Sequence, residues 1–290
     1  MSIKTSKYRS FEIINKELEF NLEEDTNVFS LKQLVINNDK IVLIGNPGMG
    51  KTYEFKNLFS DLWKEKEKTG LIPLILNIKK INIDEDDFEG YIKYKEWKLL
   101  PSIIFIIDGL DEIPSIEIFI AKLNIFIAKY ENLNLKFVIS CRTNVYELYK
   151  NSFFSFNVVR LLKLNSNQAI KILKKTHKIN IDFRKLNDYQ KIYLESPFFL
   201  NLFANYYLKN NNLPNNYSKI WEDYIEVLID MIPNQFSKNK KNQLIKNLTK
   251  CALIIELTQK NCIQLTELQI VLKNEYKDFL RNPFMERILI

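Results

Sequence analysis

The chain has 290 residues, of which 46% are hydrophobic and 27% are charged, and its formal net charge is +7. This length and composition indicate a folded protein with a sizeable core, and they exclude both a disordered chain and a large multidomain machine. The positive charge is spread among acids and asparagines, which favours solvated surfaces over a dedicated nucleic-acid-binding module. The odd number of cysteines, three in all and without metal-ligand spacing, disfavours a disulfide framework and a zinc site.

Residues 1–39 mix charged residues with scattered apolar ones, and we interpret them as a lead-in segment too small to fold as a separate effector domain. They lack the apolar core of a signal peptide, and no later run reaches the ~18 apolar residues that cross a bilayer. The sequence therefore predicts a cytoplasmic protein.

Short aliphatic runs alternate with amphipathic stretches from Lys40 onward, which is typical of a parallel sheet covered by helices. We predict strands at 41–44, 72–78, 103–107, 137–140 and 158–161, and helices at 52–68 and 116–130. This pattern predicts an α/β nucleotide-binding domain at residues 40–164.

Helical periodicity dominates after residue 164, where Asn165 and Gln168 have the spacing of a capping box at a helix start. Residues 210–216, which contain Pro214, predict a turn between two helices, and residues 232–239 predict a second linker. The predicted domains are a small helical domain at 165–239 and a further helical region at 240–290.

The most specific motif is a phosphate-loop sequence between the first predicted strand and the first long helix. Its glycines allow successive backbone N–H groups to surround a polyphosphate at a helix N-terminus. We expect Lys51 to bind phosphate oxygens and the Thr52 hydroxyl to coordinate Mg²⁺, whereas the alternative is a glycine turn without chemical purpose. The candidate nucleotide-binding residues of this loop are Gly45, Asn46, Pro47, Gly48, Met49, Gly50, Lys51 and Thr52.

The aliphatic strand at 103–107 is followed by Asp108, Gly109, Leu110, Asp111 and Glu112. Ligands of open α/β sheets bind at the carboxyl ends of the strands, so we expect Asp108 to hold Mg²⁺ together with the phosphate loop. Asp111 or Glu112 is expected to orient and polarise the attacking water. Helix capping is the alternative interpretation of an acid after a strand.

The strand at 137–140 ends in Ser140, Cys141 and Arg142. A guanidinium at this position is expected to bind the γ-phosphate and so to sense whether it is present. The alternative for Arg142 is a surface salt bridge. We interpret Cys141 as a small residue on a buried strand.

Together these segments resemble NACHT domains, which belong to the STAND class of P-loop NTPases. The resemblance rests on the Gly-x-Pro-Gly-x-Gly-Lys-Thr loop, the Ile-Pro-Leu strand at 72–74, the Asp-Gly-Leu-Asp-Glu segment at 108–112 and the Ser-Cys-Arg segment at 140–142. Residues 196–200 are similar to the proline motif of the family's small helical domain, which implies that Pro197 packs against the adenine. The alternative is a proline in the first turn of a helix. Residues 219–232 and 240–258 resemble the helices that follow in the family, and residues 262–290 resemble the beginning of a winged-helix domain.

The resemblance implies an ATP/ADP-binding switch with Mg²⁺ that hydrolyses ATP slowly, closes on ADP and opens with ATP into oligomers. It also implies a role in signalling or bacterial-type antiphage defence, with self-association or partner proteins that supply effector and sensor functions. The preference for ATP over GTP is implied by the resemblance, since no guanine-reading Asn/Thr-Lys-x-Asp sequence is present. Two alternatives are an AAA-type ATPase with continuous turnover and a basic nucleic-acid-binding protein.

Overall fold

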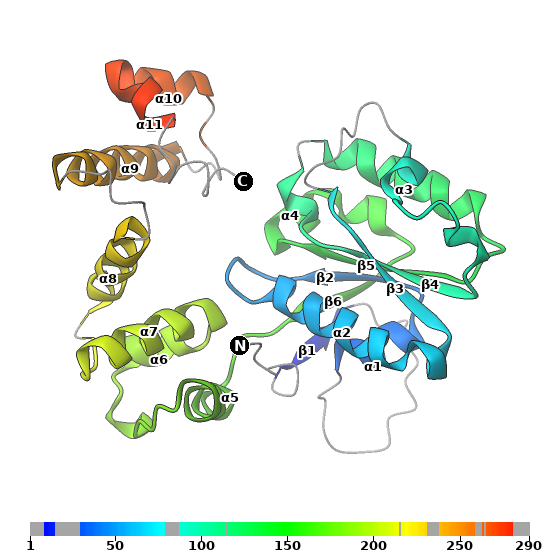
Figure 1. The fold of residues 1–290 in the computed structure, drawn as a ribbon, viewed down its shortest axis with the longest axis horizontal. Coiled ribbons are helices and arrows are strands. Elements are labelled where there is room, and N and C mark those ends of the chain that lie inside the picture. The colour runs from blue at the N-terminus through cyan, green and yellow to red at the C-terminus, as the bar shows by residue number, and fades with distance from the viewer. Residues whose placement is uncertain are drawn as a thin grey trace. The chain divides into compact units, whose positions relative to one another are not determined.

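The computed structural model describes residues 9–14, 30–78, 87–113, 115–214, 216–230, 238–258, 263 and 265–280. These residues form two compact units, with the boundary between Asn212 and Leu213. The first unit contains a β-sheet with helices, and the second is helical (Figure 1).

The sheet contains six strands, five of which are parallel. In chain order the strands are β1 (Phe11–Ile13), β2 (Lys40–Ile44), β3 (Leu71–Leu76), β4 (Ser102–Ile107), β5 (Leu135–Cys141) and β6 (Asn157–Leu161). Their spatial order is β1-β6-β2-β5-β4-β3, and β1 pairs antiparallel with β6. Because β5 lies between β2 and β4, the carboxyl ends of these three parallel strands meet at one edge of the sheet.

Helices cover both faces of the sheet (Figure 1). Helices α1 (Leu31–Asn37) and α2 (Lys51–Thr69) pack on one face, and α3 (Ile116–Lys129) and α4 (Thr143–Tyr149) pack on the other. Successive side chains of a strand point to opposite faces, so Leu43 belongs to the core with α2 and Val42 to the core with α3. Burial on both faces explains why the central strands are continuous apolar runs.

The rest of the first unit consists of short helices. They are α5 (Ser166–Ile172), a π-helical segment (Leu173–His177), α6 (Asp188–Leu194) and α7 (Pro197–Asn210). The predicted capping box of Asn165 and Gln168 is confirmed, and Asn187 with Gln190 forms a second one at α6. Pro197 occupies the first turn of α7, where a missing backbone N–H breaks no helical hydrogen bond.

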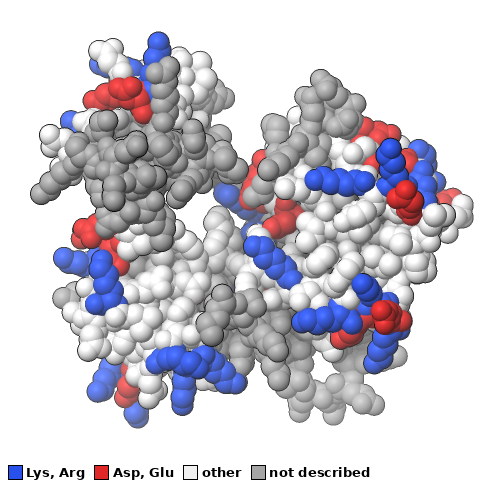
Figure 2. All heavy atoms as spheres, in the orientation of Figure 1, with Lys and Arg blue, Asp and Glu red and all other residues white. Residues whose placement is uncertain are grey.

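The second unit contains α8 (Tyr217–Asp230), α9 (Lys238–Thr258), α10 (Leu265–Leu272) and α11 (Tyr276–Leu280). Its described core is small and consists of Leu244, Cys251, Leu268, Leu272 and Phe279. Across the described residues, no helix combines the length and the apolar character that a bilayer crossing requires. On the first unit, Figure 2 shows basic and acidic side chains interspersed on the visible face.

The predicted α/β fold is confirmed, and most of its elements differ from the prediction only at their ends. Strand β3 ends at Leu76, two residues earlier than predicted, although Ile78 is still buried. Two elements, β1 and α1, were not predicted within residues 1–39. Most of the predicted linker at 232–239 and much of the region from 262 onward lie outside the described residues, and the predicted domain limits stay predictions.

Candidate functional site

The loop between β2 and α2 has a backbone that requires glycine at two positions. Gly48 has a φ of +76° and Gly50 a φ of +90°, both in the left-handed region that L side chains rarely adopt. Helix α2 begins immediately after Gly50, so its first backbone N–H groups, which have no partner within the helix, lie at the end of this loop. The local geometry is that of an anion-binding helix N-terminus preceded by a glycine turn.

Lys51 places its ammonium group against the loop. Its Nζ donates to the carbonyl oxygens of Gly45 at 2.5 Å and Asn46 at 3.4 Å. Burial lowers the pKa of Lys51, and the negative charge of Asp111 opposes this effect. A partly buried ammonium whose hydrogen bonds go to neutral carbonyls is a favourable partner for an anion.

The carboxyl end of β4 is joined to β5 through a buried hydroxyl. The register Ile107↔Ile139 continues one residue further and places Asp108 beside Ser140. The Ser140 Oγ donates to Asp108 Oδ1 at 2.5 Å and accepts from the backbone N–H of Gly109 at 2.8 Å. Ser140 was not among the predicted site residues. A hydroxyl residue in an otherwise apolar strand, next to a strand that ends in an acid, could have indicated it.

Asp111 and Arg142 form an ion pair. Arg142 Nε lies 2.6 Å from Asp111 Oδ2, and the backbone N–H of Arg142 donates to Asp111 Oδ1 at 3.1 Å. The Asp111 side chain is 5% exposed and that of Arg142 is 37% exposed. Both carboxylate oxygens of Asp111 therefore interact with Arg142, so Arg142 forms the salt bridge that was the alternative interpretation of this residue. A role of either residue toward a phosphate stays a prediction.

Glu112 is the second acid of this segment and lies in a short 3-10 turn (Leu110–Glu112) that begins after Gly109. Gly109 has a φ of +83°, and a Cβ there would lie 3.1 Å from Glu112 Cδ. The glycine thus allows the carboxyl group of an exposed Glu112 to fold back toward the strand end. This position keeps Glu112 among the residues around the site.

Cys141, the last residue of β5, is fully buried. Burial raises the pKa of its thiol to about 12, so the group stays protonated at neutral pH. This agrees with the interpretation of Cys141 as a packing residue. Cys251 is also a free buried thiol, and Cys262 lies outside the described residues.

A cavity of about 480 Å³ brings the predicted residues together. This volume lies within the range of small-molecule sites in proteins. Of the predicted residues, only Gly45 and Asn46 do not line the cavity, and their carbonyl groups accept from Lys51. The predicted residues that line it are Pro47, Gly48, Met49, Gly50, Lys51, Thr52, Asp108, Asp111, Glu112, Arg142 and Pro197.

The N-terminus of α7 closes one side of this cavity. The carbonyl oxygen of Gly48 accepts hydrogen bonds from the Phe198 backbone N–H and from Ser196 Oγ, each at 3.2 Å. Pro197 lies next to Gly50, since a Cβ on that glycine would be 3.8 Å from Pro197 Cγ. The helical part of the first unit therefore contacts the glycine loop directly, and the contact of Pro197 with an adenine stays a prediction.

Two buried charged residues that were not predicted also line the cavity. Arg9 is 2% exposed and donates from Nη2 to the carbonyl oxygen of Leu162 at 2.8 Å. Glu54, on α2, is 3% exposed, and burial raises its pKa to about 7 against the opposing effect of Arg9. Burial likewise lowers the pKa of Arg9 to about 10. Glu54 could have been recognised from the sequence, because it is an acid on the apolar face of α2 beside Phe55. Arg9 lies in no motif that would have indicated it.

Magnesium would need phosphate oxygens to complete its coordination at this site. Among the described residues, no cluster of three or more histidine, cysteine, aspartate or glutamate side chains could hold a metal. Mg²⁺ in nucleotide sites is commonly held by one or two protein oxygens together with phosphates and water. One hydroxyl from Thr52 and one carboxylate from Asp108, both at this cavity, match that donor set.

No protein-family model matches this chain, and no curated protein matches it. Among solved structures, DnaA from Aquifex aeolicus with AMPPCP is 12% identical, with a TM-score of 0.43, over 89% of this chain and 86% of that chain. The RuvB Holliday junction branch migration motor of Thermotoga maritima is 15% identical, with a TM-score of 0.40, over 86% and 80%. Hsp104 with ATPγS and casein is 16% identical, with a TM-score of 0.40, over 74% of this chain and only 43% of the Hsp104 chain. At this level of similarity, none of these proteins assigns a family or an activity to the chain.

Proposed function

We propose that this chain binds a nucleoside triphosphate with Mg²⁺, preferentially ATP, and hydrolyses it slowly. The observation that supports the proposal is that Lys51 and Thr52, at the start of α2, and Asp108, at the end of β4, line the same cavity. A cation, a hydroxyl and a carboxylate around a glycine-lined helix N-terminus are the groups that a magnesium polyphosphate requires.

Each residue has a distinct task in this proposal. The loop N–H groups and Lys51 would bind phosphate oxygens, with the Lys51 ammonium moving from the carbonyls of Gly45 and Asn46 to the anion. Bound Mg²⁺ would neutralise charge that develops on the phosphates, and Thr52 and Asp108 would hold it. Ser140 would fix the Asp108 carboxylate through its 2.5 Å hydrogen bond.

The water-orienting role falls to Glu112 rather than Asp111 in this proposal. Both oxygens of Asp111 are bonded to Arg142 and its side chain is only 5% exposed, so little of it is accessible to a water. Glu112 is exposed at the rim of the same cavity. Asp111 would instead hold Arg142 in position near the γ-phosphate.

The NACHT-type switch is the finer part of the proposal. Its structural support is the contact between Gly48 of the glycine loop and residues Ser196 and Phe198 at the start of α7. A nucleotide shifts a conformational equilibrium only through contacts that differ between the two states. Phosphates bound beside Gly48 would alter this contact, so ADP would favour the closed form and ATP an open, self-associating form. The role in signalling or defence rests on the resemblance alone.

The nucleotide content and the turnover of the purified protein test this proposal. We expect wild-type protein to release ADP or ATP on denaturation and Lys51→Ala to release none, while Lys64→Ala, on the exposed face of α2, serves as the matched control. Glu112→Gln should retain nucleotide and lose hydrolysis. Wild-type protein that binds no nucleotide would overturn the proposal, and rapid continuous turnover would favour an AAA-type ATPase over a switch.

A further inference from the structure

Two oppositely charged side chains, Arg9 and Glu54, are buried at the cavity. Arg9 precedes β1 and Glu54 lies in the first turn of α2, and both line the cavity. In the strand order, β1 and β6 lie on one side of β2, whereas β5 and β4, which carry Ser140 and Asp108, lie on the other. Phosphates at the loop after β2 would therefore have Asp108 on one side and Arg9 on the other.

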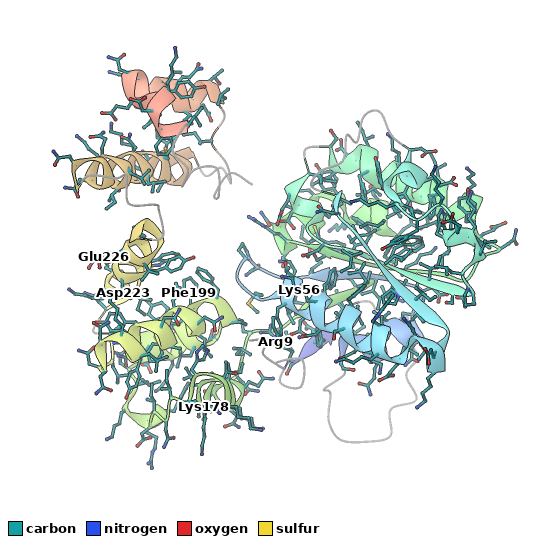
Figure 3. The ribbon with its side chains drawn as sticks, in the orientation of Figure 1. Arg9, Lys56, Lys178, Phe199, Asp223 and Glu226 are labelled. Carbon is teal, nitrogen blue, oxygen red and sulfur yellow. The ribbon has the colours of Figure 1, made fainter. Side chains whose placement is uncertain are left out.

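Two of the three nitrogens of the Arg9 guanidinium have no hydrogen-bond partner among the described residues. Its Nη2 has an acceptor in the carbonyl of Leu162, but Nε and Nη1 are buried and have no hydrogen-bond partner among the described residues. A buried donor without an acceptor is unfavourable, and more so when it belongs to a charged group. Arg9 lines the cavity, so a ligand bound there lies close to a guanidinium that lacks two acceptors. Figure 3 shows Arg9 on the side of the sheet next to α5–α7.

Glu54 and Arg9 interact without direct contact. Each shifts the pKa of the other through its charge, yet no ion pair within 4.0 Å joins them in the described part of the chain. The two groups are therefore close enough to attract each other and too far apart to satisfy each other. A ligand group with an acceptor next to a donor would bind both.

We propose that Arg9 and Glu54 form a nucleobase-binding pair, in which Arg9 donates to a ring nitrogen of adenine and Glu54 accepts from its exocyclic amino group. This inference rests on the proposed function. Arginine only donates and a carboxylate only accepts, so together they match an edge with a ring-nitrogen acceptor beside an amino donor. Ile172, Pro197 and Leu200, which line the same cavity, supply apolar contacts for the base.

Binding measurements on the full chain with Mg²⁺ and four probes test the pair. The probes are inorganic tripolyphosphate, ATP, purine riboside triphosphate, which lacks the amino group, and 2′-deoxy-ATP. We expect ATP to bind roughly 10- to 100-fold more tightly than tripolyphosphate. Removal of the amino group should weaken binding about tenfold or more, because it leaves Glu54 unpaired, and removal of the 2′-hydroxyl should have little effect.

Two variants test the assignment to these residues. In Glu54→Gln the difference between ATP and purine riboside triphosphate should largely disappear, and Arg9→Gln should weaken ATP binding while tripolyphosphate binding stays unchanged. Unchanged tripolyphosphate binding also shows that each variant is folded. Arg160→Gln is the matched control, because Arg160 lies on β6, is 41% exposed and pairs with Glu12 outside the cavity.

The outcomes separate this inference from the proposed function. If wild-type protein binds neither tripolyphosphate nor ATP, the proposed function itself fails. If it binds both equally, or binds purine riboside triphosphate as tightly as ATP, the phosphate site stands and the Arg9–Glu54 inference is wrong. A selective loss with 2′-deoxy-ATP would assign the pair to the ribose and overturn the inference as well. The four probes on wild-type protein decide this even if a variant does not fold.

Discussion

Replacing Ser140 with alanine removes the hydroxyl that connects β5 to Asp108 and Gly109, which follow β4. The hydroxyl donates to Asp108 and accepts from the backbone N–H of Gly109, and Ser140 is fully buried on β5. The substitution removes a single oxygen, so it changes the packing of the sheet little. Its effect therefore reports on the two hydrogen bonds.

The expected loss of stability follows from the hydrogen bond that each partner, Gly109 and Asp108, loses. The Gly109 N–H is buried, and an unsatisfied buried amide costs about 1–3 kcal/mol. Asp108 is only partly buried, so water replaces much of its lost hydrogen bond. We expect Ser140→Ala to lower the free energy of unfolding by about 2–3 kcal/mol. The freed Asp108 carboxylate should also weaken magnesium binding, by about 10- to 100-fold, as for other lost partners of metal ligands.

Urea unfolding and the Mg²⁺ dependence of ATP binding measure the two effects. Ser102→Ala is the matched control, because the exposed Ser102 hydroxyl on β4 donates at 3.3 Å to the Asn134 carbonyl. The control should change stability by less than about 0.5 kcal/mol. If Ser140→Ala behaves like the control in both assays, the Ser140 hydroxyl does not position the Asp108 carboxylate for Mg²⁺.

Three further predictions concern other parts of the cavity. Gly48→Ala forces a side chain into a φ of +76° with its Cβ 3.1 Å from Phe198 Cβ, so we expect a loss of about 1–2 kcal/mol in urea unfolding and faster amide exchange at the start of α7. Unchanged exchange would contradict the contact. The Glu54 carboxyl, whose pKa burial raises from 4.5 to about 7, gives stability that is present below pH 4.5 and lost as the pH rises through 7. The free energy of unfolding of wild-type protein should therefore fall by about 3 kcal/mol relative to that of Glu54→Gln over this pH range. If the two free energies change in parallel with pH, the pKa of Glu54 is not raised. Asp111→Asn should destabilise the nucleotide-free protein by about 1–2 kcal/mol, and a double-mutant cycle with Arg142→Gln that is fully additive would exclude their coupling.

The elements that local sequence determines were predictable. The strand at 103–107 is an unbroken apolar run because both faces of β4 are buried, and Gly48 and Gly50 of the loop are required by their positive φ angles. Asp108 was predictable because an acid at the end of such a strand has a defined place at the sheet edge. Short elements lacked such signals: β1 has three residues, and its place in the sheet comes only from pairing with β6.

The partners of individual polar groups were not predictable, because they depend on strand order and register. Nothing local indicates that Ser140 binds Asp108, which lies 32 residues earlier, until β5 is placed beside β4. The same holds for Arg142, whose pairing with Asp111 narrowed the choice of a water-orienting acid. Arg9 belongs to the segment interpreted as a lead-in, and only the tertiary structure brings it to the cavity with Glu54.

The central claim is that Lys51 and Asp108 act on the same magnesium-bound polyphosphate. Calorimetric titration of ATP, with Mg²⁺ and with EDTA, into wild type, Lys51→Ala and Asp108→Asn tests it most directly. We predict that Lys51→Ala loses binding under both conditions, whereas Asp108→Asn binds ATP equally weakly with Mg²⁺ and without it. Wild-type affinity in Lys51→Ala, or an undiminished effect of Mg²⁺ in Asp108→Asn, would contradict the claim.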